Sequence, residues 1–346
     1  MSKYYTRACN FYYGSLSKTL VRKKKSIPLN GNKEISFDKV EVKSRKLKRK
    51  ISINRLNKLP KLQKKQVFQD LQKITSKKKN FANLNFSRLP NIMGVLNLTP
   101  DSFSDGGKFN KKNIGINHAM EMFESGADLI DVGGESTRPG SRGINEKTEW
   151  SRIKNILKEL CNKIPVSLDT RKSEIMKKGI NLGIKIINDV SGLNYDTETK
   201  NILKKYRIPF VIQHSLGTPE NMQKNPSYKN ELLDIYDFFE KKIQFLRSIG
   251  IKHNNIIIDP GIGFGKNLKH NMNLIRNISI FHTLGFPILV GNSRKKFIKE
   301  LSGKNDTKNR TGGTVASSIY LMMQGVQILR VHEVNEILQG LKVFKE

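Results

Sequence analysis

The sequence has little cysteine, few acidic side chains and no long apolar run. Its two cysteines, Cys9 and Cys161, lie far apart in the chain. We therefore expect neither a disulfide framework nor a cysteine-based metal cluster, and this sparse use of cysteine suits the reducing cytoplasm. Because no run of about 18 apolar residues occurs, we expect no membrane-spanning helix and no membrane partner. The opening residues, MSKYYTR, also lack the apolar segment of a secretory signal.

Acidic residues are outnumbered about two to one, with 30 Asp and Glu against 63 Lys and Arg, so the net charge is +33. Residues 1–90 hold 25 basic and 4 acidic residues, a net of +21, which leaves +12 for residues 91–346. Such a basic segment raises the alternative of a nucleic-acid-binding protein. However, residues 43–67 contain no aromatic side chain on which bases would stack, so we do not expect nucleic acid as a partner.

Residues 1–90 form a Lys-rich N-terminal extension whose pattern differs from the rest of the chain. Apolar and polar residues alternate over residues 35–42, which predicts one or two short β-strands. Residues 43–80 are rich in lysine and favour a mobile connector with a short helix over residues 61–74. Strand-like alternation is not typical of an organelle transit peptide, so a small β subdomain followed by a linker is the better interpretation.

From residue 91 to residue 346, an apolar run, a polar loop and a helical segment follow one another eight times. Short apolar strands that alternate with helices predict a parallel sheet covered by helices. Eight such units in about 255 residues predict an α/β fold, the (β/α)8 TIM barrel. The expected strands are residues 91–97, 128–133, 165–169, 185–188, 209–214, 255–259, 287–291 and 327–331, and helical spacing is clearest over residues 114–125, 150–162, 231–249 and 272–284.

Polar motifs follow the ends of these apolar runs. In a barrel all of them would lie on one rim, the face where active sites are built. The first, NLTPDSFSDGG at residues 97–107, combines an amide, hydroxyls, carboxylates and an aromatic ring, which is more chemistry than a turn needs. The others are GGESTRPG (133–140), DTRK (169–172), NDVSG (188–192), DPGIGFGK (259–266), GNSRK (291–295) and RVH (330–332).

Four motif residues carry the hydrogen-bonding groups that suit a flat heterocycle. Asp169 and Asp259 supply carboxylates, and Asn188 and Lys295 supply an amide and an ammonium group. A ligand that pairs a buried carboxylate gains specificity, because leaving that group unpaired is costly. The alternative is that each aspartate only caps the helix that follows it.

A second set of motif residues is basic. Arg138 and Arg330 offer guanidinium groups that suit a pyrophosphate, because they form paired, charge-assisted hydrogen bonds. His332 closes the last expected strand beside Arg330. We group it with these cations as a donor to phosphate oxygens.

In order and in position, the seven motifs resemble those of the dihydropteroate synthases of the pterin-binding family, and the resemblance covers roughly residues 91–346. It implies a transferase of folate biosynthesis that condenses 6-hydroxymethyl-7,8-dihydropterin diphosphate with 4-aminobenzoate to give 7,8-dihydropteroate and pyrophosphate. It also implies the barrel fold, Mg²⁺ as cofactor and a homodimer.

The resemblance further implies roles for individual residues. Pterin binding is expected of Asp169, Asn188, Asp259, Lys295 and Arg330; pyrophosphate binding of Thr137, Arg138, Arg330 and His332; 4-aminobenzoate binding of Thr99, Pro100, Phe103, Pro139, Phe264 and Ser293; and Mg²⁺ contact of Asn97. The residues expected to be catalytic are Arg138, Lys295, Arg330 and His332.

The chain departs from the family pattern at the end of the fifth expected strand, where Gln213 and Ser215 stand at usual Met positions. We expect these changes to alter the pocket wall rather than the reaction. A related alternative is a pterin-binding methyltransferase that uses methyltetrahydrofolate, which would share the Asp and Asn groups but need no pyrophosphate clamp. The motifs at residues 97–107, 136–139 and 293–295 favour the synthase.

Overall fold

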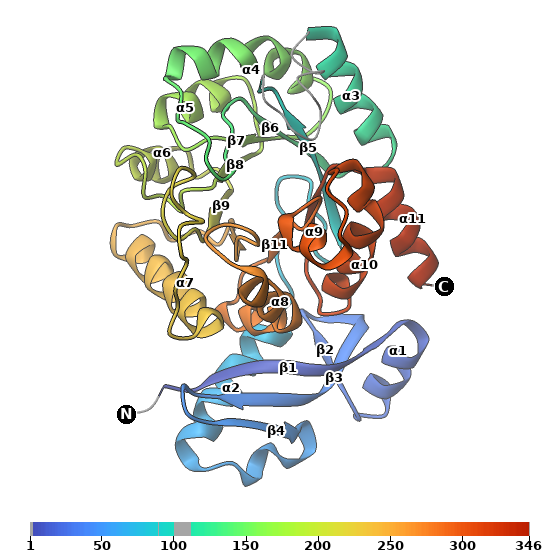
Figure 1. Cartoon of the computed structure of the whole chain (residues 1–346). Helices are drawn as coiled ribbons and strands as arrows, with labels where there is room; N and C mark the ends of the chain where they lie inside the picture. The colour runs from blue at the N-terminus through green and yellow to red at the C-terminus, as the bar shows by residue number, and fades with distance from the viewer. Residues whose placement is uncertain (1–2, 89, 100–111, 346) are drawn as a thin grey trace.

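The computed structural model describes residues 3–88, 90–99 and 112–345. Its main body is a ring of parallel strands with helices outside it (Figure 1). The strands follow one another around the ring in the order β10-β9-β8-β7-β6-β5-β12-β11, and a parallel bridge between Ile258 and Ile288 joins its two ends. The predicted (β/α)8 barrel is therefore confirmed. Its strands are β5 (Asn91–Asn97), β6 (Leu129–Gly133), β7 (Val166–Asp169), β8 (Ile186–Asp189), β9 (Phe210–Gln213), β10 (Ile256–Asp259), β11 (Leu289–Val290) and β12 (Ile328–Val331).

Helices cover the outside of the ring, and several begin at an asparagine whose side chain accepts a hydrogen bond from the first turn, as at Asn145, Asn230 and Asn267. They are α3 (Lys112–Glu124), α4 (Glu146–Leu160), α5 (Ser173–Asn181), α6 (Thr199–Tyr206), α7 (Glu231–Ser248), α8 (Leu268–Arg276), α9 (Lys296–Ser302), α10 (Thr311–Met322) and α11 (Val334–Lys345), with 3-10 turns η3 (Ile278–Leu284) and η4 (Lys308–Arg310). Among the described helices, none combines the length and apolar character that a membrane span needs.

One expected helix, over residues 272–284, is divided. α8 ends before Asn277, whose side-chain amide donates to the carbonyl oxygen of Asn273 at 2.9 Å and to its side-chain oxygen at 2.7 Å. An asparagine that bonds back to the preceding turn competes with the continuing helix. The chain then proceeds as the tighter turn η3 instead of a second helical segment.

The inside of the barrel has an apolar lower layer and a polar upper layer. The lower layer contains Met93, Leu129, Ile186, Val211, Ile257, Leu289 and Ile328, together with Leu84 and Phe86 from the segment before β5. Side chains two residues apart on a strand point to the same face. Five of these strands therefore present a polar side chain above the apolar layer, at Asp131, Asn188, Gln213, Asp259 and Arg330.

The N-terminal extension is a folded sheet with helices. The alternation predicted over residues 35–42 lies in the long strand β3, which pairs antiparallel with all three of the other strands. Residues 43–80, expected to be mainly a connector, contain regular structure, and α2 buries Val67, Leu71 and Ile74. The elements are β1 (Tyr5–Tyr13), α1 (Gly14–Arg22), β2 (Ile27–Leu29), β3 (Asn32–Lys43), β4 (Lys48–Ser52), η1 (Ile53–Lys58) and α2 (Lys61–Thr75).

This sheet lies below the barrel in the view of Figure 1. It contacts η3 and the turn before β12, where the last two strands begin, so it packs at the end opposite the polar layer. The hydroxyl of Tyr5 donates to Asp237 on α7 at 2.9 Å, and the Ser279 hydroxyl of η3 donates to the carbonyl oxygen of Ala8 at 3.0 Å. Gly325, in the turn before β12, has a φ of +77°, and a Cβ there would lie only 2.1 Å from a methyl group of Leu29. The close approach of the two parts therefore depends on a glycine.

Candidate active site

Arg330 is the centre of the polar layer. Its Nε donates to Asp131 Oδ2 at 2.6 Å, and its Nη2 donates to Asp169 Oδ2 at 2.8 Å. Asn188 Nδ2 donates to the same Asp131 oxygen at 3.0 Å. Side chains from β6, β7, β8 and β12 thus meet in one network, although they are up to 199 positions apart in the sequence. The two carboxylates fix the plane of the guanidinium group.

Each member of this network except Arg330 also has a buried atom without a partner. Asp131 Oδ1, Asp169 Oδ1 and Asn188 Oδ1 are buried oxygens that accept no hydrogen bond within the described residues, and Gln213 Nε2 is a buried nitrogen that donates none. Buried polar atoms in native proteins are nearly always paired. Several unpaired atoms at one end of a barrel therefore indicate a place where a ligand supplies the missing partners.

Burial controls the charge of the two aspartates expected from the sequence. It raises the pKa of Asp169 to about 8, with the Arg330 guanidinium opposing the shift, and it raises the pKa of Asp259 to about 6. A ligand that donates N–H groups would favour the ionised carboxylates again. Asp259 Oδ1 accepts from the Gly261 amide at 2.8 Å. This bond is a turn interaction and not the helix cap considered as the alternative, because Asn267 caps the following helix α8. It uses only one of the two oxygens.

Lys295 follows β11 and packs against the loop after β10, where a Cβ on Gly263 would lie 3.2 Å from Lys295 Cδ. Its Nζ is 4.2 Å from the centre of the Phe264 ring. Burial, followed by the field of Arg330, lowers the pKa of Lys295 to about 8, whereas Asp259 raises it. The structure thus brings together an ammonium group, an aromatic face and a carboxylate, as the sequence predicted for the pterin and aminobenzoate residues.

His332 and Ser293 are in direct contact: Ser293 Oγ lies 2.9 Å from His332 Nδ1 and donates to Glu333 Oε2 at 3.1 Å. Burial, and then the nearby cations Arg294 and Arg330, hold the pKa of His332 well below its usual range. The imidazole is therefore neutral near pH 7. The sequence-based grouping of His332 with the cations has to be corrected, because a neutral ring contributes a hydrogen bond and no charge.

The loop between β6 and α4, which carries Thr137, Arg138 and Pro139, is held by a buried ion-pair network. Glu135 accepts from Arg171 Nε at 2.8 Å and from the Ile144 amide at 2.9 Å, and it pairs with Lys172 at 2.9 Å. Lys172 also pairs with Glu149. The field of Arg138 reaches Lys295 and His332, where it lowers both pKa values.

The remaining predicted residues are placed as follows. Asn97, at the end of β5, is partly exposed, and its side chain makes no hydrogen bond to the residues that the structure describes. Thr99 is buried, Thr137 and Arg138 are partly exposed, and Pro139 is exposed. Pro100 and Phe103 lie outside the described residues. No cluster of three or more His, Cys, Asp or Glu side chains suited to a metal ion occurs within the described part of the chain.

Sequence reasoning missed three parts of this site. Asp131 was not singled out, although an acid inside the apolar run LIDV was a signal for it. The Glu135–Arg171–Lys172 network was also missed, because its members pair across about 36 positions and no local spacing marks them. Lys266 is a further omission: its Nζ lies 3.1 Å from His214 Nδ1 and donates to the Phe264 carbonyl oxygen at 2.8 Å.

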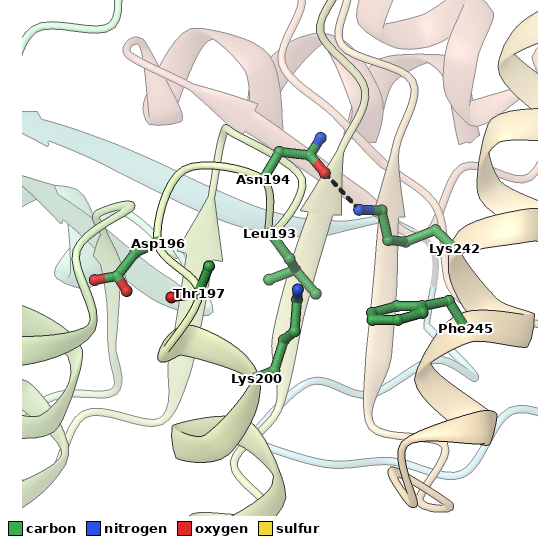
Figure 2. A pocket seen from close by; sticks show the side chains of 7 residues that line it. All are labelled: Leu193, Asn194, Asp196, Thr197, Lys200, Lys242 and Phe245. Atoms are coloured by element: carbon green, nitrogen blue, oxygen red, sulfur yellow. Dashed lines mark hydrogen bonds between the residues drawn. The ribbon is translucent and has the colours of Figure 1, made fainter.

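A separate hollow of about 290 Å³ lies beside the barrel mouth, between the loop after β8 and α7 (Figure 2). Its two lysines, its asparagine and its aspartate are already engaged. Lys242 donates to Asn194 at 2.7 Å, and Lys200 lies over the Phe245 ring at 5.0 Å. Asp196 accepts from the backbone amides of Ser173 and Glu198. The hollow therefore lacks the unpaired buried groups that distinguish the barrel mouth.

Comparison with known proteins gives a consistent result. Residues 93–332 match the family described as pterin binding enzyme. A dihydropteroate synthase of Clostridium beijerinckii is 41% identical over 248 residues, which are 71% of this chain and 89% of the relative. The Yersinia pestis dihydropteroate synthase, solved with a sulfonamide drug, superposes with a TM-score of 0.73 at 38% identity, over 75% of this chain and 94% of that one. The Xanthomonas albilineans enzyme in complex with 7,8-dihydropteroate has a TM-score of 0.67 at 31% identity, over 76% and 94%. The chain belongs to the pterin-binding enzyme family, and these relatives within it are dihydropteroate synthases.

Proposed function

We propose that the chain is a dihydropteroate synthase that joins 6-hydroxymethyl-7,8-dihydropterin diphosphate to 4-aminobenzoate and releases pyrophosphate. The observation that carries this proposal is the set of unpaired buried atoms around Arg330: acceptors at Asp131, Asp169 and Asn188 and a donor at Gln213. A pterin offers both N–H groups and acceptors on one flat ring. The match to relatives of this activity supports the same conclusion.

The pterin would lie across the barrel mouth. The second oxygen of Asp259 is available to accept from its amino-pyrimidine edge, while Lys295 donates to its carbonyl oxygen. Asp169 Oδ1 and Asn188 Oδ1 accept further N–H groups. The face of the Arg330 guanidinium, held in one plane by two carboxylates, stacks on the ring. These carboxylates also favour the positive charge that develops on the pterin.

The reaction is a substitution at the exocyclic methylene of the pterin. The bond between this carbon and the pyrophosphate oxygen breaks, and the bond to the arylamine nitrogen forms, with one N–H proton leaving to solvent. Arg138 and Thr137 bind the departing pyrophosphate. The neutral His332 donates one hydrogen bond to it from Nε2, in the tautomer whose Nδ1 accepts the Ser293 hydroxyl proton, the hydroxyl then turning from Glu333 to His332. Donors aimed at developing charge are usually the largest catalytic contribution. The arylamine is already neutral near pH 7, so no strong base is required.

4-Aminobenzoate would be held between the Phe264 ring and Ser293, with Thr99, Pro100, Phe103 and Pro139 from the neighbouring loops. Phe264 is in place for this role because Lys266 holds its carbonyl oxygen and the flanking glycines, Gly263 and Gly265, adopt φ values of +85° and +63°. Positive φ values are readily adopted only by glycine. The loop thus presents the aromatic ring towards Lys295.

Asn97 fits a contact with Mg²⁺, since the residue is partly exposed and its side chain is not engaged by the described residues. Mg²⁺ keeps several waters and phosphate oxygens, so one amide ligand is sufficient. When bound, the ion would neutralise charge on the pyrophosphate. The free thiols of Cys9 and Cys161 support a cytoplasmic location. Exposed Tyr320 and Val343 on α10 and α11 support a homodimer through these helices.

The test is release of pyrophosphate by the purified chain with each substrate omitted in turn. We expect release to require both the pterin diphosphate and 4-aminobenzoate, and to yield a product with the mass of 7,8-dihydropteroate. Release without 4-aminobenzoate would indicate a hydrolase. Methyl transfer from methyltetrahydrofolate to a corrinoid, without pyrophosphate release, would support the methyltransferase alternative.

A further inference from the structure

Gln213, the last residue of β9, is only 3% exposed, yet its side chain makes no hydrogen bond to any described residue. The buried Nε2 carries two N–H donors that have no acceptor. A buried amide in this state costs free energy unless something that binds the protein completes it. The sequence placed this residue at a position where methionine is usual and assigned it no contact.

The direction of this side chain follows from the strand alternation. Val211 belongs to the apolar layer inside the barrel, and Gln213 lies two residues further along the same strand. Gln213 therefore also points inward, one layer closer to the mouth. In the parallel register it lies beside Asp259 of β10. A Cβ on Gly261 would lie 3.4 Å from Gln213 Cγ, so the turn after Asp259 packs against this side chain.

Two other buried glutamines, Gln324 and Gln327, have a structural role, because their side chains form hydrogen bonds with other segments of the chain. Gln327 Oε1 accepts from the Ile288 amide at 2.8 Å, and Gln324 Nε2 donates to the Ile275 carbonyl oxygen at 2.7 Å. Both residues precede β12, at the opposite end of the barrel, and each uses its amide to hold another segment. Gln213 holds no other segment by a hydrogen bond.

We propose that Gln213 is a specificity-determining residue whose N–H donates to an acceptor atom of the pterin, next to the edge bound by Asp259. This inference rests on the proposed function. The N–H groups of the ring are bound by the acceptors of Asp169, Asn188 and Asp259. One of the ring acceptors is bound by Lys295. Gln213 Nε2 supplies a second donor for the acceptors that remain. Methionine at this position would fill a similar space but offer no donor.

The test compares Gln213→Met and Gln213→Glu with the wild-type full-length chain, by calorimetric titration with 6-hydroxymethylpterin. The loss of one buried hydrogen bond should raise the Kd of Gln213→Met about tenfold. Gln213→Glu should lose more than tenfold, because it replaces the donor by a second carboxylate beside Asp259. The KM for 4-aminobenzoate should stay within about twofold for Gln213→Met. Its melting temperature should not fall, because no hydrogen bond within the described residues is lost.

Gln72→Met is the matched control, since it makes the same substitution at an exposed position of α2, in the N-terminal extension. Pterin affinity of this variant should change less than about twofold. An unchanged Kd for Gln213→Met, with or without a lower melting temperature, would show that Gln213 only fills space. In that case the proposed function stands. If the wild-type chain binds no pterin, the proposed function fails first and this inference fails with it.

Discussion

Asp131→Asn tests whether the network around Arg330 contributes to stability as its geometry indicates. The substitution keeps the size of the side chain and leaves one oxygen to accept from Arg330 and Asn188, which now lie 2.6 and 3.0 Å from Asp131 Oδ2. What it removes is the negative charge. A charge-assisted hydrogen bond is about twice as strong as a neutral one, and it contributes about 1.5–3 kcal/mol.

Breaking a buried ion pair outright costs about 3–5 kcal/mol, because it leaves a buried charge without a partner. Arg330 keeps Asp169, and the loss of the Asp131 charge makes Asp169 easier to ionise, since Asp131 is one of the groups that raise its pKa. We therefore expect a smaller decrease in the free energy of unfolding, about 2 kcal/mol. With an m-value of about 3 kcal/mol/M, this lowers the urea midpoint by about 0.7 M.

The assay is urea unfolding followed by circular dichroism, with Glu174→Gln as the control. Glu174 pairs with Lys178 at 3.5 Å, but both side chains are well exposed, so its loss should change the free energy of unfolding by less than about 0.5 kcal/mol. If Asp131→Asn shifts the urea midpoint no more than this control does, the buried pair of Asp131 and Arg330 does not contribute about 2 kcal/mol to the free energy of unfolding.

Three further predictions concern catalysis, binding and pH. Arg138→Ala should lower turnover at saturating substrate by about two to three decades in a pyrophosphate-release assay, because it removes a donor to the leaving group; near wild-type turnover would remove Arg138 from the clamp. Asp259→Asn should weaken calorimetric pterin binding by at least about 2 kcal/mol, with little change in melting temperature because the amide oxygen can still accept from Gly261. For Asp70, burial raises the folded-state pKa to about 6 from 3.8, so the folded chain binds this proton more tightly than the unfolded chain. Protonated Asp70 therefore stabilises the fold below about pH 4, and this stabilisation is lost as the pH rises through about 6. In Asp70→Asn, the corresponding decrease in the free energy of unfolding, up to about 3 kcal/mol, should be absent. Urea midpoints at pH 4 and 7.5 measure this difference. If the midpoint changes equally between the two pH values in the wild-type chain and in Asp70→Asn, the argument is contradicted.

The barrel could be predicted from the sequence because its strands are short apolar runs with strong local signals. All eight expected runs overlap a strand of the structure, and their ends differ from those of the strands by no more than two residues. The polar rim could also be predicted, because the residues that follow the parallel strands all lie at the same end of a barrel. Asp131 was not predicted because it lies within the apolar run LIDV, before the strand ends and the polar motif begins, and an acid inside that run was its local signal. Its partner is Arg330, almost 200 positions away.

The extension was harder to predict, because its abundant lysines hide a narrow apolar face. In α2, Val67, Leu71 and Ile74 are buried while the lysines of the same helix face outward. Counting charge over residues 43–80 therefore suggested a connector, although the helical spacing of three and four residues was present. The high lysine content of such a helix reflects its exposed residues. The buried face is indicated only by the spacing of its apolar residues.

The two ends of the barrel are connected through the electrostatics of the site. Leu84 and Phe86 close the lower layer beneath the polar ring, and the sheet of residues 5–52 packs on the turns around that end. With this apolar layer beneath them, Asp169 and Asp259 are almost fully buried, and burial raises their pKa values. A ligand that donates N–H groups to these buried carboxylates favours their ionised forms. Packing at one end of the barrel thus contributes to the binding chemistry at the other.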